Sequence, residues 1–121
     1  MVMEPSSGRP PRVFELRSYE STSVGSLAKK TGMFNNGEIA IFRRTGLNPV
    51  FFGETLFGNH APNLVYMIWY DNWAAREANW KKFISDPEWE KLKSTPGLSD
   101  GEVVSNISNV IMSPASYSPI R

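Results

Sequence analysis

The most apolar stretch of the chain runs from Leu64 to Tyr70, seven consecutive apolar or aromatic residues between Pro62-Asn63 and Asp71-Asn72. Seven residues suit a β-strand and are too few for a membrane-spanning helix. Alternate side chains of a strand point to opposite faces of a sheet, and here both faces are apolar. Both need cover. Because a chain of this size is not expected to cover both faces alone, we predict a second copy over one of them. The faces carry Leu64, Tyr66, Ile68 and Tyr70 on one side, and Val65, Met67 and Trp69 on the other.

The N-terminal third of the chain predicts a strand followed by a helix. Residues 13–20 alternate between apolar and polar positions, which is typical of a strand with one apolar and one polar face. A seven-residue apolar repeat then indicates a helix, although Asn36-Gly37 is unfavourable inside one. We expect a continuous or kinked helix, ended by Gly46 in the left-handed cap position. The apolar repeat consists of Leu27, Phe34 and Ile41.

The middle of the chain predicts a hairpin and a second helix. Residues 48–57 have the composition of a strand, and the turn 58–63 joins it to the apolar strand in an antiparallel pair. Gly53 indicates a β-bulge or a close approach of another segment. Asp71 or Asn72 is placed to cap a helix over residues 73–84. Its expected inner face consists of Trp73, Trp80 and Ile84.

The C-terminal part predicts a short helix, a last strand and an extended tail. Asp86-Pro87 is a helix start, because Pro is favoured at the first helical position. Thr95-Pro96-Gly97 ends this helix, and residues 102–112 have the pattern of a strand. The tail, residues 113–121, has no regular pattern. Two of its side chains are available to dock on a surface, Tyr117 and Ile120.

The predicted order of elements is β-α-β-β-α-β, which is the ferredoxin-like α+β arrangement of a four-stranded antiparallel sheet with two helices on one face. The second face stays bare in a monomer. Two sheets packed face to face would bury both, so we predict a homodimer that forms a dimeric α+β barrel. The domain is expected over residues 13–112, after a flexible leader or linker at 1–12.

Composition excludes several classes of function. Of 121 residues, 13 are basic and 12 acidic, and a net charge of +1 provides no field for nucleic acid. No apolar run is long enough to span a membrane. Cysteine is absent, which excludes a disulfide framework and a thiol nucleophile but does not choose a compartment. We expect a soluble protein, cytoplasmic by default.

Two short motifs are informative in combination, namely Val13-Phe-Glu-Leu-Arg-Ser-Tyr19 and Ser85-Asp-Pro-Glu-Trp89. The first resembles the opening strand of the NIPSNAP family, and the second resembles a helix start in it. The resemblance extends over about residues 13 to 112. Further matches are Ile41-Phe-Arg-Arg-Thr-Gly46, Tyr70-Asp71 and Ala75-Arg-Glu77. Matches to a bacterial subgroup are Met33-Phe-Asn-Asn-Gly-Glu38, Asn63-Leu-Val-Tyr-Met67 and Ser105-Asn-Ile-Ser-Asn109.

The resemblance implies a dimeric α+β barrel and little about chemistry, because no general reaction is established for this family. Two such domains can occur in tandem in the bacterial subgroup, so the leader could stand where an interdomain linker would. Related barrels include cofactor-free monooxygenases, heme-degrading enzymes and small lactone isomerases. Many members of the family carry His where this chain has Tyr66, and a histidine-based mechanism is therefore not expected at that position.

Polar side chains among apolar walls are the candidate ligand-binding residues, while no catalytic residue can be assigned. An arginine can pair with a carboxylate or enolate, and a tyrosine can donate to a developing oxyanion. The alternative is structural: Arg17 pairs with Glu15 or Glu20 across the dimer, and the tyrosines only pack. A second place is Glu38 with Asn35, beside the unfavourable Gly37. The candidates are Arg17, Tyr19, Tyr66, Tyr70, Trp80 and Asn106.

No metal site and no cofactor are predicted. His60 is the single histidine and lies in a turn, so a zinc-type site lacks its further ligands, and heme binding through His60 is only a third hypothesis. Two functions stay open: a small-molecule binding or interaction module with no turnover of its own, and a cofactor-independent oxygenase or isomerase acting on a small apolar or aromatic compound. An enclosed cavity with inward polar groups would favour the enzyme. A cleft filled by the aromatic side chains of Phe34, Trp80 and Phe83 would favour the module.

Overall fold

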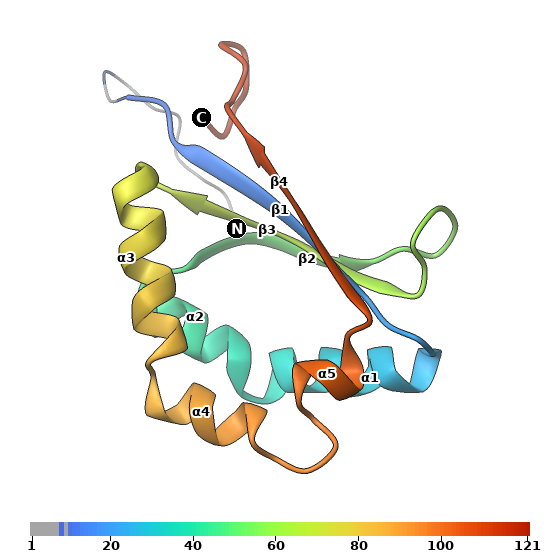
Figure 1. The fold of residues 1–121 in the computed structure, drawn as a ribbon. Coiled ribbons are helices and arrows are strands. Elements are labelled where there is room, and N and C mark those ends of the chain that lie inside the picture. The colour runs from blue at the N-terminus through green and yellow to red at the C-terminus, as the bar shows by residue number, and fades with distance from the viewer. Residues whose placement is uncertain (1–7, 9) are drawn as a thin grey trace.

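A computed structural model describes Gly8 and residues 10–121 as one four-stranded sheet with helices on one of its faces (Figure 1). Most of the predicted leader lies outside the described residues. No helix in the described part of the chain is long and apolar enough to cross a membrane. In chain order the elements are β1 (Val13–Glu20), α1 (Val24–Met33), the π-helical segment η1 (Phe34–Glu38), α2 (Ile39–Thr45), β2 (Asn48–Glu54), β3 (Asn63–Tyr70), α3 (Trp73–Ile84), α4 (Pro87–Lys93), α5 (Asp100–Val103) and β4 (Asn106–Met112).

The sheet has the strand order β2-β3-β1-β4, and every neighbouring pair is antiparallel. This arrangement confirms the α+β, ferredoxin-like prediction. The two inner strands are β1 and β3, so the side chains on one face of each strand lie under the helices. In the register of the sheet, Arg17 on β1 lies beside Tyr66 on one neighbour and beside Asn109 on the other. One row of side chains therefore crosses three strands.

The two faces of β3 have different surroundings, as its pattern predicts. Tyr66, Ile68 and Tyr70 are wholly buried on the helix-covered face. The helix-free face is apolar but only partly covered, with Phe51 and Val110 exposed on the outer strands. No helix of the described residues lies over this face.

The first helix is kinked, which confirms the expectation raised by Asn36-Gly37. The helix continues from α1 through η1 into α2, but Gly37 leaves helical geometry with φ 175° and ψ −44°. The amide of Ile39 donates to the carbonyl of Phe34, five residues back, so one extra residue is accommodated here. As predicted, Gly46 ends α2 in the left-handed conformation, with φ 88°.

The predicted second strand is too long, and the expectation for Gly53 is wrong. Strand β2 ends at Glu54, and Leu56 and Phe57 are almost fully exposed in the loop beyond it. The Thr55 amide donates to the Asn63 side chain at 3.1 Å, which ends the ladder of backbone hydrogen bonds. The register shift lies earlier in the strand, between residues 49 and 51, and the space beside Gly53 is open.

The predicted inner face of α3 is also wrong in part. Trp73 and Ile84 are more than half exposed, and Phe83 is the buried aromatic residue of this helix. The side chains directed to the sheet are Arg76, Trp80 and Phe83, spaced four and three residues apart. Arg76 belongs to this inner face, although it is charged, because it donates to the buried Glu15 carboxylate on β1.

The last strand begins later than predicted, at Asn106. Residues 102 and 103 belong instead to α5, which is stabilised by a reciprocal capping box between Ser99 and Glu102. In the tail, Tyr117 is 90% exposed and does not dock. The side chain of Ile120 does reach the helix-free face, where it lines a small pocket of about 150 Å³ with Phe14, Met67 and Met112.

Candidate functional site

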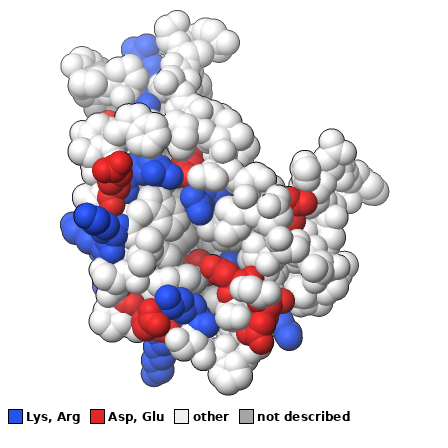
Figure 2. Space-filling model, viewed as in Figure 1, with Lys and Arg blue, Asp and Glu red and all other residues white. Residues whose placement is uncertain are grey.

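A hollow of about 370 Å³ opens between the sheet and the helices, lined by residues of β1, β4, η1, α3, α4 and α5. Figure 2, in the orientation of Figure 1, shows acidic and basic atoms interspersed on this side of the molecule, with neither sign dominating. The polar residues of the wall are Arg17, Tyr19, Glu38, Arg76 and Asp100, and the apolar and aromatic ones are Trp80, Phe83, Ile84, Trp89 and Ile107.

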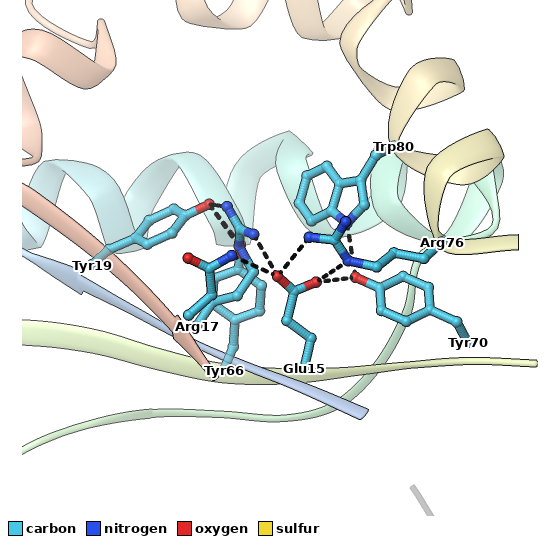
Figure 3. Close-up of polar contacts among 8 residues, drawn as sticks. Glu15, Arg17, Tyr19, Tyr66, Tyr70, Arg76 and Trp80 are labelled. Carbon is cyan, nitrogen blue, oxygen red and sulfur yellow. Dashed lines mark hydrogen bonds and ion pairs between the residues drawn. The ribbon is translucent and has the colours of Figure 1, made fainter. Parts of the chain in front are cut away.

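Behind the wall, the Glu15 carboxylate is wholly buried and accepts five hydrogen bonds (Figure 3). Its Oε1 accepts from the Tyr70 hydroxyl at 2.7 Å and from Arg76 Nε at 3.0 Å. Its Oε2 accepts from Arg17, Arg76 and Asn109 at 2.9 to 3.0 Å. Burial raises the pKa of Glu15, but the hydrogen bonds and the Arg17 charge outweigh it and lower the pKa to about 2.

Arg17 connects this buried carboxylate with the hollow. Its Nη1 donates to Glu15 at 2.9 Å, and its Nε donates to the Tyr66 hydroxyl at 3.0 Å. Nε and Nη2 also lie 3.3 and 3.2 Å from the Tyr19 hydroxyl oxygen. The guanidinium carbon lies 4.6 Å from the centre of the Trp80 ring, so the cation is stacked on an aromatic face. The cation is therefore fixed in place at the wall of the hollow.

Two tyrosine hydroxyls meet beside Arg17. The oxygens of Tyr19 and Tyr66 are 2.7 Å apart, and only one hydroxyl hydrogen can lie between them. Arg17 donates to both oxygens, so the second hydroxyl hydrogen needs a different acceptor. None of the residues at positions 8 and 10–121 provides one. Since Tyr19 lines the hollow, an unused O–H donor lies next to a fixed cation.

Tyr70 and Trp80 form a separate chain of hydrogen bonds. Trp80 Nε1 donates to the Tyr70 hydroxyl at 2.7 Å, and that hydroxyl donates to Glu15. Burial and the neighbouring carboxylate raise the pKa of Tyr70. Burial also raises the pKa of Tyr66 well above its ordinary value. Both phenols therefore stay neutral and act as donors. Tyr70 does not line the hollow, but its hydroxyl connects Trp80 with Glu15.

On another wall of the hollow, Glu38 forms a buried cluster with Lys30 and Asp100. Lys30 Nζ lies 3.2 Å from Glu38 Oε2 and 3.0 Å from Asp100 Oδ1. The ammonium also lies 5.1 to 5.5 Å from the ring centres of Tyr19, Phe34 and Trp89. Burial and the Asp100 charge raise the pKa of Glu38 to about 7, because they outweigh the opposing effect of Lys30 and Arg17.

Five of the six predicted ligand-binding residues lie together, namely Arg17, Tyr19, Tyr66, Tyr70 and Trp80. Asn106 lies elsewhere. It pairs with Glu20 in the register of the sheet, on the face opposite to the hollow, and donates to the Glu20 carboxylate at 2.6 Å. Asn109 on the same strand reaches Glu15 instead. Arg17 pairs with Glu15 inside one chain rather than across a dimer.

The sequence did not identify Arg76, Asn109 or Lys30, and it named Glu15 only as a structural partner of Arg17. Glu15 had a signal, because it alternates with Arg17 and Tyr19 along β1 and shares their face. The lysine had none, since a buried ammonium is rare. Phe34 and Phe83 fill the deep part of the helix–sheet layer, and the hollow remains above them beside Arg17.

The single histidine lies outside the site. His60 is an exposed loop residue with φ 65°, and its Nδ1 lies 3.1 Å from the Glu20 carboxylate. In the part of the chain that the structure describes, no group of three or more potential metal ligands is assembled. No observation therefore connects the histidine with the hollow.

Comparison with known proteins identifies the family to which this chain is similar. The NIPSNAP family model matches residues 14–119. A NIPSNAP family protein from Agrobacterium tumefaciens superposes with a TM-score of 0.83 at 20% identity, covering 98% of this chain and 99% of that one. An uncharacterized NIPSNAP-like domain protein from Burkholderia xenovorans has a TM-score of 0.78 at 21% identity, with 89% of each chain covered. No match to a curated protein was found.

A more distant likeness is to an enzyme. A monooxygenase from Streptomyces coelicolor, solved in complex with the ligand nanaomycin D, has a TM-score of 0.58 at 12% identity, covering 89% of this chain and 91% of that one. At this identity the likeness concerns the fold alone.

Proposed function

This chain belongs to the NIPSNAP family, and we propose that it binds a small, largely apolar molecule in the hollow, with an anionic or enolic oxygen held by Arg17 and Tyr19. The observation that carries this proposal is the unused hydroxyl hydrogen beside a fixed, half-buried arginine. Such a donor pair is matched to a carboxylate, phenolate or enolate oxygen.

The rest of the hollow suits the apolar part of such a molecule. A volume of about 370 Å³ falls in the ordinary range for small-molecule sites. Trp80, Phe83 and Ile107 supply aromatic and aliphatic wall. A ligand with one planar ring and one charged or enolic oxygen would use both kinds of surface.

A second candidate function is cofactor-independent oxygenation or isomerisation of a small apolar or aromatic compound. It is favoured by Glu38, a buried carboxyl in the same hollow with a pKa near neutrality. The Streptomyces coelicolor monooxygenase, of the same fold, is in complex with nanaomycin D. Fold does not transfer function, so this candidate depends on the carboxyl and not on the neighbour.

Binding is tested with phenylpyruvate, which combines an aromatic ring, a carboxylate and an enolisable carbonyl. Trp80 and Trp89 line the hollow, so saturable quenching of tryptophan fluorescence would report occupancy. We expect Tyr19→Phe to weaken binding about 10-fold, which is the effect of one hydrogen bond to a charged group. Tyr117→Phe, a matched change at a 90% exposed residue, should leave binding unchanged. Absence of saturable binding by the unmodified protein would refute the proposal.

We further infer that the helix-free face of the sheet pairs with the same face of a second copy. The open part of this face carries Leu16 and the exposed Phe51 and Val110, and an apolar surface of this kind marks an interaction site. The expected mass in solution at micromolar concentration is twice that of one chain. Val110→Asp should dissociate the pair, while Ile84→Asp, on an exposed position of α3, should not. A single-chain mass for the unmodified protein would refute the pairing.

A further inference from the structure

The carboxyl of Glu38 has one oxygen in use and one available. Oε2 accepts a hydrogen bond from Lys30 at 3.2 Å. Oε1 makes no hydrogen bond with any residue of the described chain, although the side chain is only 2% exposed. Glu38 lines the hollow together with Arg17 and Tyr19. A molecule held there by its oxygen would bring its neighbouring atoms within reach of Oε1.

We propose that Glu38 is a catalytic proton-transfer residue, which takes a proton from the carbon beside a carbonyl group of the bound molecule and returns it at another position. The substrate class is a small enolisable ketone or keto acid with an aromatic or apolar body. This inference rests on the proposed function, because Arg17 and Tyr19 must hold the carbonyl oxygen.

The transfer balances without any oxidant, reductant or cofactor. Glu38 Oε1 forms an O–H bond while the C–H bond breaks, and the electron pair of that bond becomes the carbon–carbon double bond of an enolate. The negative charge moves to the carbonyl oxygen, where the Arg17 cation and the Tyr19 hydroxyl stabilise it. Return of the proton to oxygen or to a different carbon gives the tautomer or isomer and restores the carboxylate.

The surroundings of Glu38 suit both the uptake of the proton from carbon and its return to the substrate. The charged and titratable groups that act on it are Lys30 from α1, Asp100 from α5 and Arg17 from β1, with the neutral Tyr66 hydroxyl from β3. Their combined effect with burial is a pKa of about 7. A group with this pKa is ionised often enough to accept a proton at neutral pH and acidic enough to return it.

The conformation of the carboxyl is fixed by its partner. Lys30 is wholly buried and bound to Asp100 as well as to Glu38. Burial lowers the pKa of Lys30, but the two carboxylates outweigh it and raise the pKa above its usual value. The ammonium therefore stays charged and holds Oε2, while Oε1 has no hydrogen-bond partner among the described residues.

The experiment measures exchange of the C3 hydrogens of phenylpyruvate for deuterium by NMR, after subtraction of the rate in buffer. We expect the protein to accelerate exchange, and Glu38→Gln to reduce the acceleration about 100-fold or more. Phenylpyruvate affinity, from tryptophan quenching, should change less than about 3-fold in this variant. Glu77→Gln, an isosteric change on the exposed face of α3, is the matched control and should exchange like the unmodified protein.

A second variant keeps the test decisive if Glu38→Gln folds poorly. The Asp100 charge raises the pKa of Glu38, so Asp100→Asn should move the midpoint of the pH–rate profile from about 7 to a lower pH. A residue with a merely structural role would not shift this midpoint. Binding of phenylpyruvate without accelerated exchange, exchange that survives Glu38→Gln, or an unshifted midpoint overturns this inference and leaves the binding proposal standing. Absence of binding overturns both.

Discussion

Arg76 on α3 donates two parallel hydrogen bonds to Glu15 on β1, from Nε to Oε1 and from Nη2 to Oε2, each 3.0 Å long. Two parallel bonds fix direction as well as distance. Because Glu15 is wholly buried, this pair sets where α3 lies on the sheet. One turn further along α3, Trp80 is thereby held over Arg17 at the wall of the hollow.

Replacement of Arg76 by Met should therefore destabilise the fold. The change leaves part of a buried carboxylate without its donors, and we expect the free energy of unfolding to fall by about 2–3 kcal/mol. The matched control is Arg44→Met, because Arg44 is 44% exposed where it pairs with Asp86. An exposed pair should lose less than about 1 kcal/mol. Denaturation by guanidinium chloride measures both, and equal losses would contradict a special role for the Glu15 pair.

The depressed pKa of Glu15 predicts a loss of stability in acid. The carboxyl binds its proton near pH 4.5 when unfolded and near pH 2 when folded, so the unfolded state takes up more protons between these values. The contribution is fully present above pH 4.5 and is lost as the pH falls through about 2. Its size is on the order of 3 kcal/mol, and Glu15→Gln should flatten this part of the stability profile. An unchanged profile between pH 2 and 4.5 in the variant would contradict the assignment.

The sequence predicts the sheet well and the site only in part, for physical reasons. Strands β1 and β3 follow from alternation and apolar runs, which depend on local side-chain direction. The cap at Gly46 follows from backbone sterics alone. By contrast, alternation along β1 does not show that its polar face is the one covered by helices, with Glu15 buried and Arg17 half-buried. Their burial is stabilised by donors on α3 and β4, and a pattern within one strand carries no information about them.

The same limit explains the errors on α3 and on β4. A helix stripe is identified by apolar residues, so Arg76 was excluded from the inner face and Ile84 was included. Asn106 and Asn109 are equally polar in sequence, and only the register with β1 decides which of them reaches the site. The hollow itself depends on how α3, α4 and α5 pack together, which no single segment encodes.

Gly46 should be the glycine of this chain that tolerates alanine least. Its φ is +88°, and an added Cβ would lie 3.1 Å from the Asn79 side chain, which donates to the Gly46 carbonyl. We expect Gly46→Ala to lower the free energy of unfolding by about 1–2 kcal/mol. Gly53→Ala is the control, because nothing lies within 4 Å of the added atom, and it should change stability by less than about 0.5 kcal/mol. Urea denaturation of both variants measures the difference, and a harmless Gly46→Ala would contradict it.

The tail should stabilise the fold through one side chain only. Ile120 lines the small pocket over Phe14 and Met67, whereas Tyr117 is 90% exposed. We expect Ile120→Ser to lower the free energy of unfolding by about 1 kcal/mol, through lost apolar contact. The same change at Tyr117 should have no measurable effect. Thermal unfolding distinguishes the two variants, and similar midpoints for both would show that the tail does not pack on the sheet.

The raised pKa of Glu38 predicts the opposite pH dependence to that of Glu15. Burial raises this pKa to about 7 in the folded protein, against 4.5 as the ordinary value, so the folded state binds more protons between these limits. Stability is therefore lost as the pH rises from about 4.5 through 7, by an amount on the order of 3 kcal/mol. Glu38→Gln cannot ionise and should abolish this decline, while Glu77→Gln should retain it.

Ligand binding should raise the pKa of Glu38 further. An anionic oxygen held near Arg17 adds negative charge to the hollow that Glu38 lines, and this favours the protonated carboxyl. Binding of phenylpyruvate near pH 7 should then take up protons, which calorimetry in buffers of different ionisation enthalpy measures. Glu38→Gln should remove the uptake. Proton uptake that persists in this variant would assign the titration to another group and separate Glu38 from the ligand.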